Sequence, residues 1–142
     1  MAVARVVLDT NVLVAALRSR RGAAFRLLTL VGRGHFESAV SVPLVLEYEA
    51  AAKRHARVAG LTAREIDDVL DYLVSVADRR PIFFLWRPYL KDPNDDLVLE
   101  LAVEAECQWI VTYNQRDFAG AERFGVRIVT PREFLALRGL LS

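Results

Sequence analysis

The stretch Val3–Leu17, VARVVLDTNVLVAAL, constrains this chain most because it changes from a strand pattern to a helix pattern within a few residues. It opens with a short, β-branched apolar run and then reaches Asp9, Thr10 and Asn11, polar residues of the types that cap helices. A strand that runs directly into a helix is half of a βαβ unit and therefore predicts a parallel sheet. Ligands of open parallel sheets bind beyond the carboxyl ends of the strands, where we expect Asp9 to lie.

The bulk composition predicts one globular domain. The chain has 142 residues, 54% of them hydrophobic, so we expect a single domain over residues 1–142 with a sizeable core. A net charge of +1 leaves nucleic-acid binding to local basic patches. The single cysteine, Cys107, excludes a disulfide within one chain, and its apolar neighbours indicate a core position. No apolar run reaches the ~20 residues of a membrane span, so we expect a cytoplasmic protein.

Apolar periodicity predicts short strands that alternate with helices. We expect strands at residues 3–8, 36–42, 81–85, 108–112 and 126–129. We expect helices at residues 11–18, 22–32, 43–56 and 62–77, one that begins at Asp92 and Pro93, and one that begins at Thr130 and Pro131. Strands this apolar do not suit a half-exposed sheet. The sequence therefore predicts an α/β fold, a three-layer α/β/α sandwich around a central, mostly parallel sheet of four to five strands.

Glu47 has an unusual setting in the helix expected at 43–56. It lies within the apolar stripe, three residues after Leu44 and four before Ala51. An inward-facing carboxylate needs a partner, because an unpaired buried charge is costly. Two interpretations stay open: a ligand in a functional site, or a side chain at the edge of the stripe that reaches water or an arginine.

The stretch Lys91–Thr112 is the second informative region. Asp92 and Pro93 have the pattern of an N-cap followed by a first-turn proline. Asp95, at the third helical position, is explained by an arrangement like a capping box. Asp96 then has no local structural role.

The orientation of Asp96 is ambiguous from the pattern alone. Leu99 and Val103, three and seven residues on, place it towards the inner side of the helix. Glu100 and Glu104 continue from it at i+4 steps, which would instead make it the start of a solvated acidic stripe. Like charges at that spacing are slightly unfavourable, and both interpretations stay open.

Four acids could face the carboxyl edge of one parallel sheet: Asp9, Glu47, Asp96 and Asp117. Converging carboxylates repel one another unless cations neutralise them. Mg²⁺ takes oxygen ligands, keeps several waters and binds substrate phosphates. Such an ion activates water and stabilises charge on a phosphodiester, so the residues indicate metal-dependent phosphodiester hydrolysis.

Four motifs resemble those of the PIN-domain nucleases and occur in that family's order: LDTNVL (8–13), PLVLEYEAAAKR (43–54), DPNDDLVLELA (92–102) and IVTYNQRDF (110–118). The chain is most similar to the VapC-type toxin subunits of prokaryotic toxin–antitoxin pairs. The resemblance implies that the catalytic and metal-binding quartet is Asp9, Glu47, Asp96 and Asp117. It also implies that the residues supporting the metal and its waters are Thr10, Asn11, Thr112 and Asn114. Asn114 and Asp117 could share or exchange the role of the fourth acid.

The resemblance implies a Mg²⁺- or Mn²⁺-dependent endoribonuclease that leaves a 5′-phosphate and a 3′-hydroxyl. It further implies a cognate antitoxin partner and a homodimer. Three basic clusters could supply the phosphate contacts that RNA binding needs: Arg18, Arg20 and Arg21; Lys53, Arg54 and Arg57; and Arg79 and Arg80.

Other functions fit the residues less well. The main alternative is a catalytically inactive PIN-like module that binds RNA or protein, but its signature would be a missing acid, and none of the first three is missing. A haloacid-dehalogenase-type phosphatase needs a second aspartate two residues after Asp9, where Asn11 stands. A dinucleotide-binding fold needs a glycine-rich turn after the first strand. A receiver domain needs a paired acid beside Asp9 and a late lysine, and the chain has neither.

Overall fold

The computed structural model describes residues 3–81 and 90–141, which form a five-stranded sheet with helices around it. The strands are β1 (Ala4–Leu8), β2 (Phe36–Val40), β3 (Asp78–Arg79), β4 (Trp109–Val111) and β5 (Arg127–Val129). The helices are α1 (Thr10–Arg18), α2 (Ala23–Leu30), α3 (Val42–Arg54), α4 (Ala56–Ala59), α5 (Ala63–Val76), α6 (Pro93–Glu104) and α7 (Pro131–Leu137). Two short 3₁₀ turns, η1 (Gln115–Phe118) and η2 (Ala121–Phe124), follow β4.

The sheet is entirely parallel, with the strand order β3-β2-β1-β4-β5. β1 is the central strand: its Val6 pairs with Ser38 of β2 on one side and with Trp109 of β4 on the other. All strands therefore end at the same edge of the sheet, and the residues that follow β1 and β4 come close together there. The expected parallel sheet and three-layer α/β/α arrangement are confirmed.

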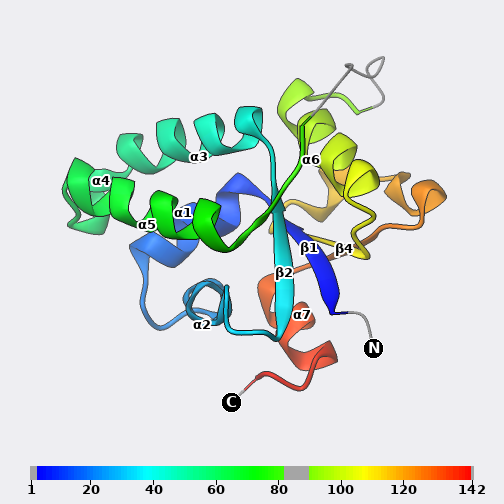
Figure 1. Cartoon of the computed structure of the whole chain (residues 1–142), viewed down its shortest axis with the longest axis horizontal. Helices are drawn as coiled ribbons and strands as arrows, with labels where there is room; N and C mark the ends of the chain where they lie inside the picture. Colours follow the sequence, from blue (N-terminus) through cyan, green and yellow to red (C-terminus); the bar gives the residue numbers. More distant parts are fainter. Residues whose placement is uncertain (1–2, 82–89, 142) are drawn as a thin grey trace.

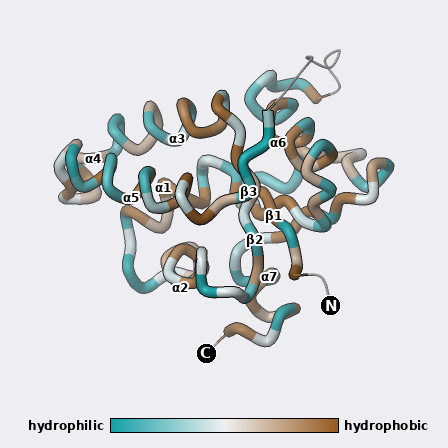
Figure 2. The backbone as a smooth tube through the Cα atoms, in the orientation of Figure 1, coloured by the Kyte–Doolittle hydropathy of each residue, from teal (hydrophilic) through white to brown (hydrophobic). Residues whose placement is uncertain are grey.

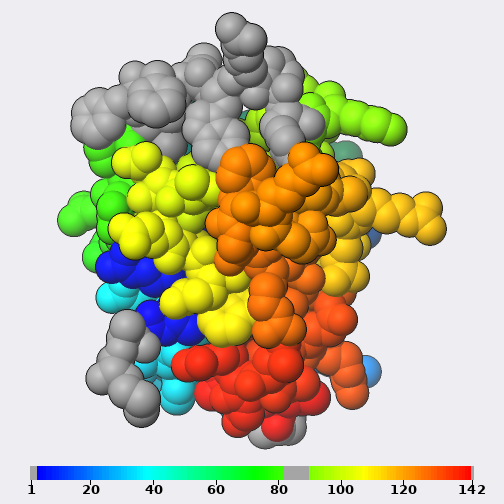
Figure 3. All heavy atoms as spheres, turned by 90° about the vertical axis from the view of Figure 1, so that its right-hand side faces the viewer, coloured from blue at the N-terminus to red at the C-terminus, as the bar shows by residue number. Residues whose placement is uncertain are grey.

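The helices cover both faces of the sheet. Figure 1 shows α1, α3, α4 and α5 to one side of the strands and α6 to the other, with α2 and α7 below. Phe134 of α7 packs edge-on against Phe36 of β2 and Trp109 of β4, with ring centroids 5.4 Å apart in each pair. Aromatic pairs of this geometry add about 0.5–1.5 kcal/mol beyond the area that they bury. Figure 3, turned by 90°, shows α7 in red at the foot of the face formed by α6 and the η1–η2 region.

Local sequence signals account for most helix boundaries. The predicted capping boxes are both present, Thr62 with Glu65 at the start of α5 and Thr130 with Glu133 at the start of α7. The apolar positions of α5 recur at helical spacing, and Figure 2 shows its turns alternating between hydrophilic and hydrophobic residues. Cys107 is buried, as its apolar neighbours predicted.

The structure differs from the expected elements in three places. The third strand is the polar pair Asp78–Arg79, whereas the expected strand at 81–85 falls, apart from Pro81, outside the described residues. β2 ends at Val40, because Ser41 caps α3 by accepting a hydrogen bond from the Leu44 backbone N–H (3.3 Å). The turn expected after β4 is built as η1 and η2. In residues 3–81 and 90–141, no helix is long and apolar enough to cross a membrane.

Candidate active site

Asp9 lies at the carboxyl end of β1 and is the N-cap of α1. Its Oδ1 accepts a hydrogen bond from the Thr10 backbone N–H (2.8 Å). Its Oδ2 accepts one from the Thr112 hydroxyl (2.8 Å) and a longer one from Asn11 Nδ2 (3.3 Å). Burial raises the pKa of Asp9; the hydrogen bonds from Thr112 and Thr10 partly oppose this shift, whereas the charges of nearby Asp117 and Asp92 add to it.

Asn11 and Thr112 hold the ends of β1 and β4 together. Asn11 Nδ2 also donates to Thr112 Oγ1 (3.2 Å), while Asn11 Oδ1 accepts from the Tyr113 backbone N–H (3.2 Å). The backbone N–H of Asn114 donates to Thr112 Oγ1 (3.0 Å), whereas the Asn114 residue is exposed. Thr112 is fully buried, and its hydroxyl hydrogen-bonds to Asp9 just after β1, to Asn11 of α1 and to the loop before η1. The structure thus brings these predicted supporting residues together around Asp9.

Glu47, on the second turn of α3, faces the start of α1. Burial is the main cause of its raised pKa; the Thr10 hydroxyl opposes that shift, and the charges of Asp9 and Asp92 add to it. Glu47 Oε2 and Thr10 Oγ1 are both buried, yet neither has a well-formed hydrogen bond to any described residue. Buried polar atoms are normally satisfied, so such a pair indicates a place for a ligand.

Tyr48, the neighbour of Glu47, is buried in the core. Its hydroxyl donates a hydrogen bond to the main-chain carbonyl of Leu8, the residue before Asp9. Burial, and then the charges of Asp9 and Glu47, raise the pKa of Tyr48, so its hydroxyl stays protonated and remains a donor.

Asp95 lies close enough to the other carboxylates of this edge for their charges to act on it. Burial raises the pKa of Asp95 to about 7, and the charges of Asp9, Asp92, Asp117 and Glu47 add to the shift. Asp92 caps α6 as expected, but its side chain accepts from the Asn94 N–H (2.9 Å) and the Asp95 N–H donates to the Asp92 main-chain carbonyl (3.0 Å), so the capping box expected with Asp95 is not formed. Sequence reasoning therefore missed Asp95 as a candidate site residue.

Asp96 is placed differently. It is 7% exposed, and its Oδ1 accepts a hydrogen bond from the Leu90 backbone N–H (2.8 Å). Glu100, one turn later, is also buried, so Asp96 lies on the inner side of α6 and does not begin a solvated stripe. This hydrogen bond ties the start of α6 to the segment that precedes it.

Asp117 lies on η1 and is exposed. It lines a cleft of about 520 Å³ that runs from the start of α6 to η1. The lining also includes Asp92 and Asp95 and two cations, Lys91 and Arg116. Neither cation forms an ion pair with a described residue, although both lie beside aspartates. A sequence signal for these two cations exists, because each immediately precedes an aspartate of the cleft.

The basic clusters singled out from the sequence differ in their relation to the site, and Arg54 lies near enough to Glu47 for its charge to lower the pKa of that carboxyl. α1 has nine residues, so Arg18 at its end lies about 13 Å along the helix axis from Asp9 at its start. Lys53 pairs with Glu49 (3.4 Å), as expected from their i,i+4 spacing, and with Asp67 (3.0 Å). Arg80 pairs with Asp78 (3.0 Å).

The donor set at this edge of the sheet fits a hard divalent cation. Asp9, Glu47, Asp95 and Asp117 offer only oxygen ligands, which are the ligands that Mg²⁺ and Mn²⁺ take. Burial, and then the charges of neighbouring acids, raise the pKa values of Asp9, Glu47 and Asp95, and a cation would relieve the cost of their charged forms. Across 3–81 and 90–141, no three acidic, histidine or cysteine side chains lie close enough together, as they are placed, to hold a metal ion. The unsatisfied Glu47 oxygen is the position best prepared for one.

Comparison with known proteins identifies the family and a similar fold. The sequence model of the PIN domain family, described as "PIN domain", matches residues 5–116. A search of the curated proteins finds no match. A chain in the crystal structure of VapBC2 from Rickettsia felis bound to a DNA fragment from their promoter has a similar fold, with a TM-score of 0.56 at 15% sequence identity. The similarity covers 89% of this chain and 98% of that chain. Because the family match extends over most of the chain, from β1 to η1, this chain belongs to the PIN domain family.

Proposed function

We propose that this chain is a divalent-metal-dependent endoribonuclease. PIN domains are nucleases that generally use divalent metal ions, which sets the class of reaction. The observation that carries the proposal is the electrostatic coupling of Asp9, Glu47, Asp95 and Asp117 at one edge of a parallel sheet. Carboxylates gathered in this way repel one another in their charged forms, and a bound cation would neutralise that repulsion.

We assign the ion, Mg²⁺ or Mn²⁺, to Asp9, Glu47, Asp95 and Asp117. When bound, it would lower the pKa of a water and stabilise negative charge on the phosphodiester. Asp95 takes the place that motif matching gave to Asp96, because Asp95 faces the other acids, whereas Asp96 accepts a hydrogen bond from the Leu90 backbone. Asp96 then positions α6.

The chain's own residues prepare this site. The Thr10 N–H, Thr112 and Asn11 orient the Asp9 carboxylate. The hydrogen bonds from Thr112 and the Thr10 N–H oppose the rise in its pKa and so favour the charged form that a cation needs. Glu47 Oε2 is free to accept a proton or orient a water beside Asp9. Asn114 supports the site through its backbone N–H, which donates to the Thr112 hydroxyl, and we do not assign its side chain as a metal ligand.

Lys91 and Arg116 support an RNA substrate. They line the cleft next to Asp95 and Asp117 and have no ion-pair partner among the described residues. Once a cation offsets the charge of the carboxylates, two unpaired positive side chains favour the phosphates on either side of the scissile bond. Cleavage by an activated water would leave a 5′-phosphate and a 3′-hydroxyl.

We further propose that the chain is the toxin of a toxin–antitoxin pair, held inactive by an antitoxin, and that it forms a homodimer. The support is the fold shared with a chain of the VapBC2 structure, whose description names a two-component assembly bound to promoter DNA. The four sequence motifs and their order support the same conclusion.

The test is cleavage of 5′-labelled RNA by the purified chain with Mg²⁺, Mn²⁺ or EDTA. The Asp9→Asn variant is assayed under the same conditions. The proposal predicts cleavage with metal, no cleavage with EDTA, and loss of cleavage in Asp9→Asn. RNA that is retained on a filter but never cut would favour the binding-module alternative. Cleavage that survives both EDTA and the substitution would contradict the assignment of the site.

A further inference from the structure

The structure links two candidate metal ligands through one hydrogen bond in the core. Tyr48 follows Glu47 on α3, and Leu8 precedes Asp9 at the end of β1. The Tyr48 hydroxyl donates to the Leu8 carbonyl across 40 positions of sequence. Because neighbouring Cα atoms are ~3.8 Å apart, a bond between Tyr48 and Leu8 restricts the separation of Glu47 and Asp9.

The end of β1 needs this bond because its pairing with β2 has already stopped. The register between β1 and β2 ends at Val6 and Ser38, two residues before Leu8. On the other side, β4 still pairs with Leu8 through Val111, and the Asp9 N–H donates to the Val111 carbonyl (2.9 Å). The Tyr48 side chain therefore supplies, on the β2 side, the hydrogen bond that a neighbouring strand supplies elsewhere.

Glu47 is restrained less firmly at its own carboxylate, because the Thr10 hydroxyl acts on it without forming a well-aligned hydrogen bond to Oε2. Its Oε2 lacks a hydrogen bond from any described residue, so its place depends on how α3 is held. Tyr48 is 3% exposed and packs within the core, so its ring moves little relative to β1. The bond between its hydroxyl and the Leu8 carbonyl connects α3 directly to the backbone beside Asp9.

We propose that Tyr48 is a positioning residue, whose hydroxyl sets the distance between Asp9 and Glu47 and thereby the affinity of the site for a divalent metal. This inference rests on the proposed metal-dependent function. Tyr48 itself touches neither metal nor RNA in this account and acts only through Asp9 and Glu47. Outer-shell groups of this kind typically change metal affinity about 10- to 100-fold when they are removed.

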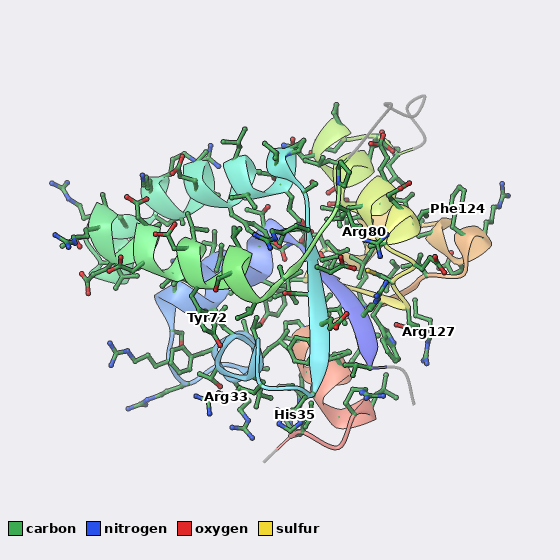
Figure 4. All side chains as sticks on the ribbon, in the orientation of Figure 1. Arg33, His35, Tyr72, Arg80, Phe124 and Arg127 are labelled. Atoms are coloured by element: carbon green, nitrogen blue, oxygen red, sulfur yellow. The ribbon has the colours of Figure 1, made fainter. Side chains whose placement is uncertain are left out.

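The chain offers a matched control in Tyr72. Its hydroxyl also donates to a main-chain carbonyl, that of Val31 (2.8 Å), across 41 positions. Figure 4 shows Tyr72 between α5 and α2, away from the start of α3. Tyr48→Phe and Tyr72→Phe thus remove the same type of bond, but only the first removes it beside Asp9.

The experiment is titration of the metal-free chain with Mn²⁺ by calorimetry, for the unaltered chain, Tyr48→Phe, Tyr72→Phe and Asp9→Asn. We expect Tyr48→Phe to weaken Mn²⁺ binding about tenfold and Tyr72→Phe to change it less than twofold, even if both lower the melting temperature. Sucrose, which stabilises folded states, is present throughout so that Tyr48→Phe is measured as a folded protein. Equal Mn²⁺ affinity of Tyr48→Phe and the unaltered chain would overturn the inference.

A double-mutant cycle tests whether Tyr48 acts through Glu47. In a Glu47→Gln background, Tyr48→Phe should change Mn²⁺ affinity less than twofold, whereas a full tenfold effect there would contradict the positioning role. Failure of the proposed function looks different: Asp9→Asn would then bind Mn²⁺ as tightly as the unaltered chain, or neither would bind it.

Discussion

The hydroxyl of Thr112 donates a 2.8 Å hydrogen bond to the carboxylate of Asp9, although the two residues lie 103 positions apart in the sequence. The bond joins the ends of two adjacent parallel strands, β1 and β4, and it favours the charged form of Asp9. It therefore connects the topology of the sheet to the protonation state of the candidate metal site.

Thr112→Val should weaken the site at low pH. Removing the hydroxyl leaves Asp9 Oδ2 with only the longer bond from Asn11, so the pKa of Asp9 rises further. A hydrogen bond to a charged group contributes about 1.5–3 kcal/mol, which corresponds to a shift of about one to two pH units. We expect the acid limb of the pH–rate profile for RNA cleavage to move upward by about one unit. Thr29→Val, which removes an exposed threonine hydroxyl on α2, should leave the profile unchanged.

The stability of the metal-free chain should fall as the pH rises. Burial raises the folded-state pKa values of Asp9, Glu47 and Asp95, the last to about 7, so the folded chain binds more protons than the unfolded chain. Stability is then gained as the pH falls from about 7 towards the unfolded-state values near 4. With EDTA present, we therefore expect a higher melting temperature at pH 5.5 than at pH 8.

Asp95→Asn is the control for that dependence. The substitution removes a carboxyl group whose pKa is raised to about 7, so the melting temperature of the variant should change less with pH than that of the unaltered chain. Saturating Mn²⁺ should reduce the dependence in the unaltered chain, because a bound cation favours the charged carboxylates. A melting temperature that rises between pH 5.5 and pH 8 would contradict the raised pKa values.

Lys91→Ala and Arg116→Ala should weaken RNA binding without weakening metal binding. Each removes a cation of the cleft, and loss of one charge-assisted contact of about 1.5 kcal/mol should raise KM about tenfold. The slope of log affinity against log salt concentration should become shallower by about 0.7 for each lost contact with single-stranded RNA. Mn²⁺ affinity should be retained or rise.

Arg127→Ala is the matched control for the two cations. Arg127 is exposed and begins β5, so it lies at the amino end of the sheet, opposite the candidate site, and Figure 4 shows it away from α3. Its removal should change neither KM nor the salt slope. A rise in KM as large for Arg127→Ala as for Arg116→Ala would indicate that RNA binding responds to overall charge and not to contacts in the cleft.

Local sequence signals predicted much of the fold. The capping boxes at Thr62 and Thr130 and the change from strand to helix at Asp9 are encoded within a few residues, and they set helix boundaries directly. The strand Asp78–Arg79 carries no such signal, because two polar residues show no apolar periodicity. It forms because it pairs with Ala39 and Val40 of β2, which is a tertiary interaction.

The choice between Asp95 and Asp96 could not be predicted from periodicity. Successive residues of a helix point about 100° apart, so a difference of one position decides which side chain faces the site. α6 is buried over most of its surface, including the side of Glu100, and a helix without one clear apolar stripe does not reveal its orientation. The cations of the cleft were missed for a related reason, since Lys91 and Arg116 are neighbours only in the folded chain.

The most direct measurement of the central claim is the rate of RNA cleavage, with Mn²⁺, by Asp95→Asn beside Asp96→Asn. The two variants make the same chemical change at adjacent positions. We predict that Asp95→Asn, in a folded protein, loses activity by about 100-fold or more. Asp96→Asn should lower the free energy of unfolding by about 1–3 kcal/mol and retain activity within about tenfold when folded. Loss of cleavage in folded Asp96→Asn with full activity in Asp95→Asn would contradict the account.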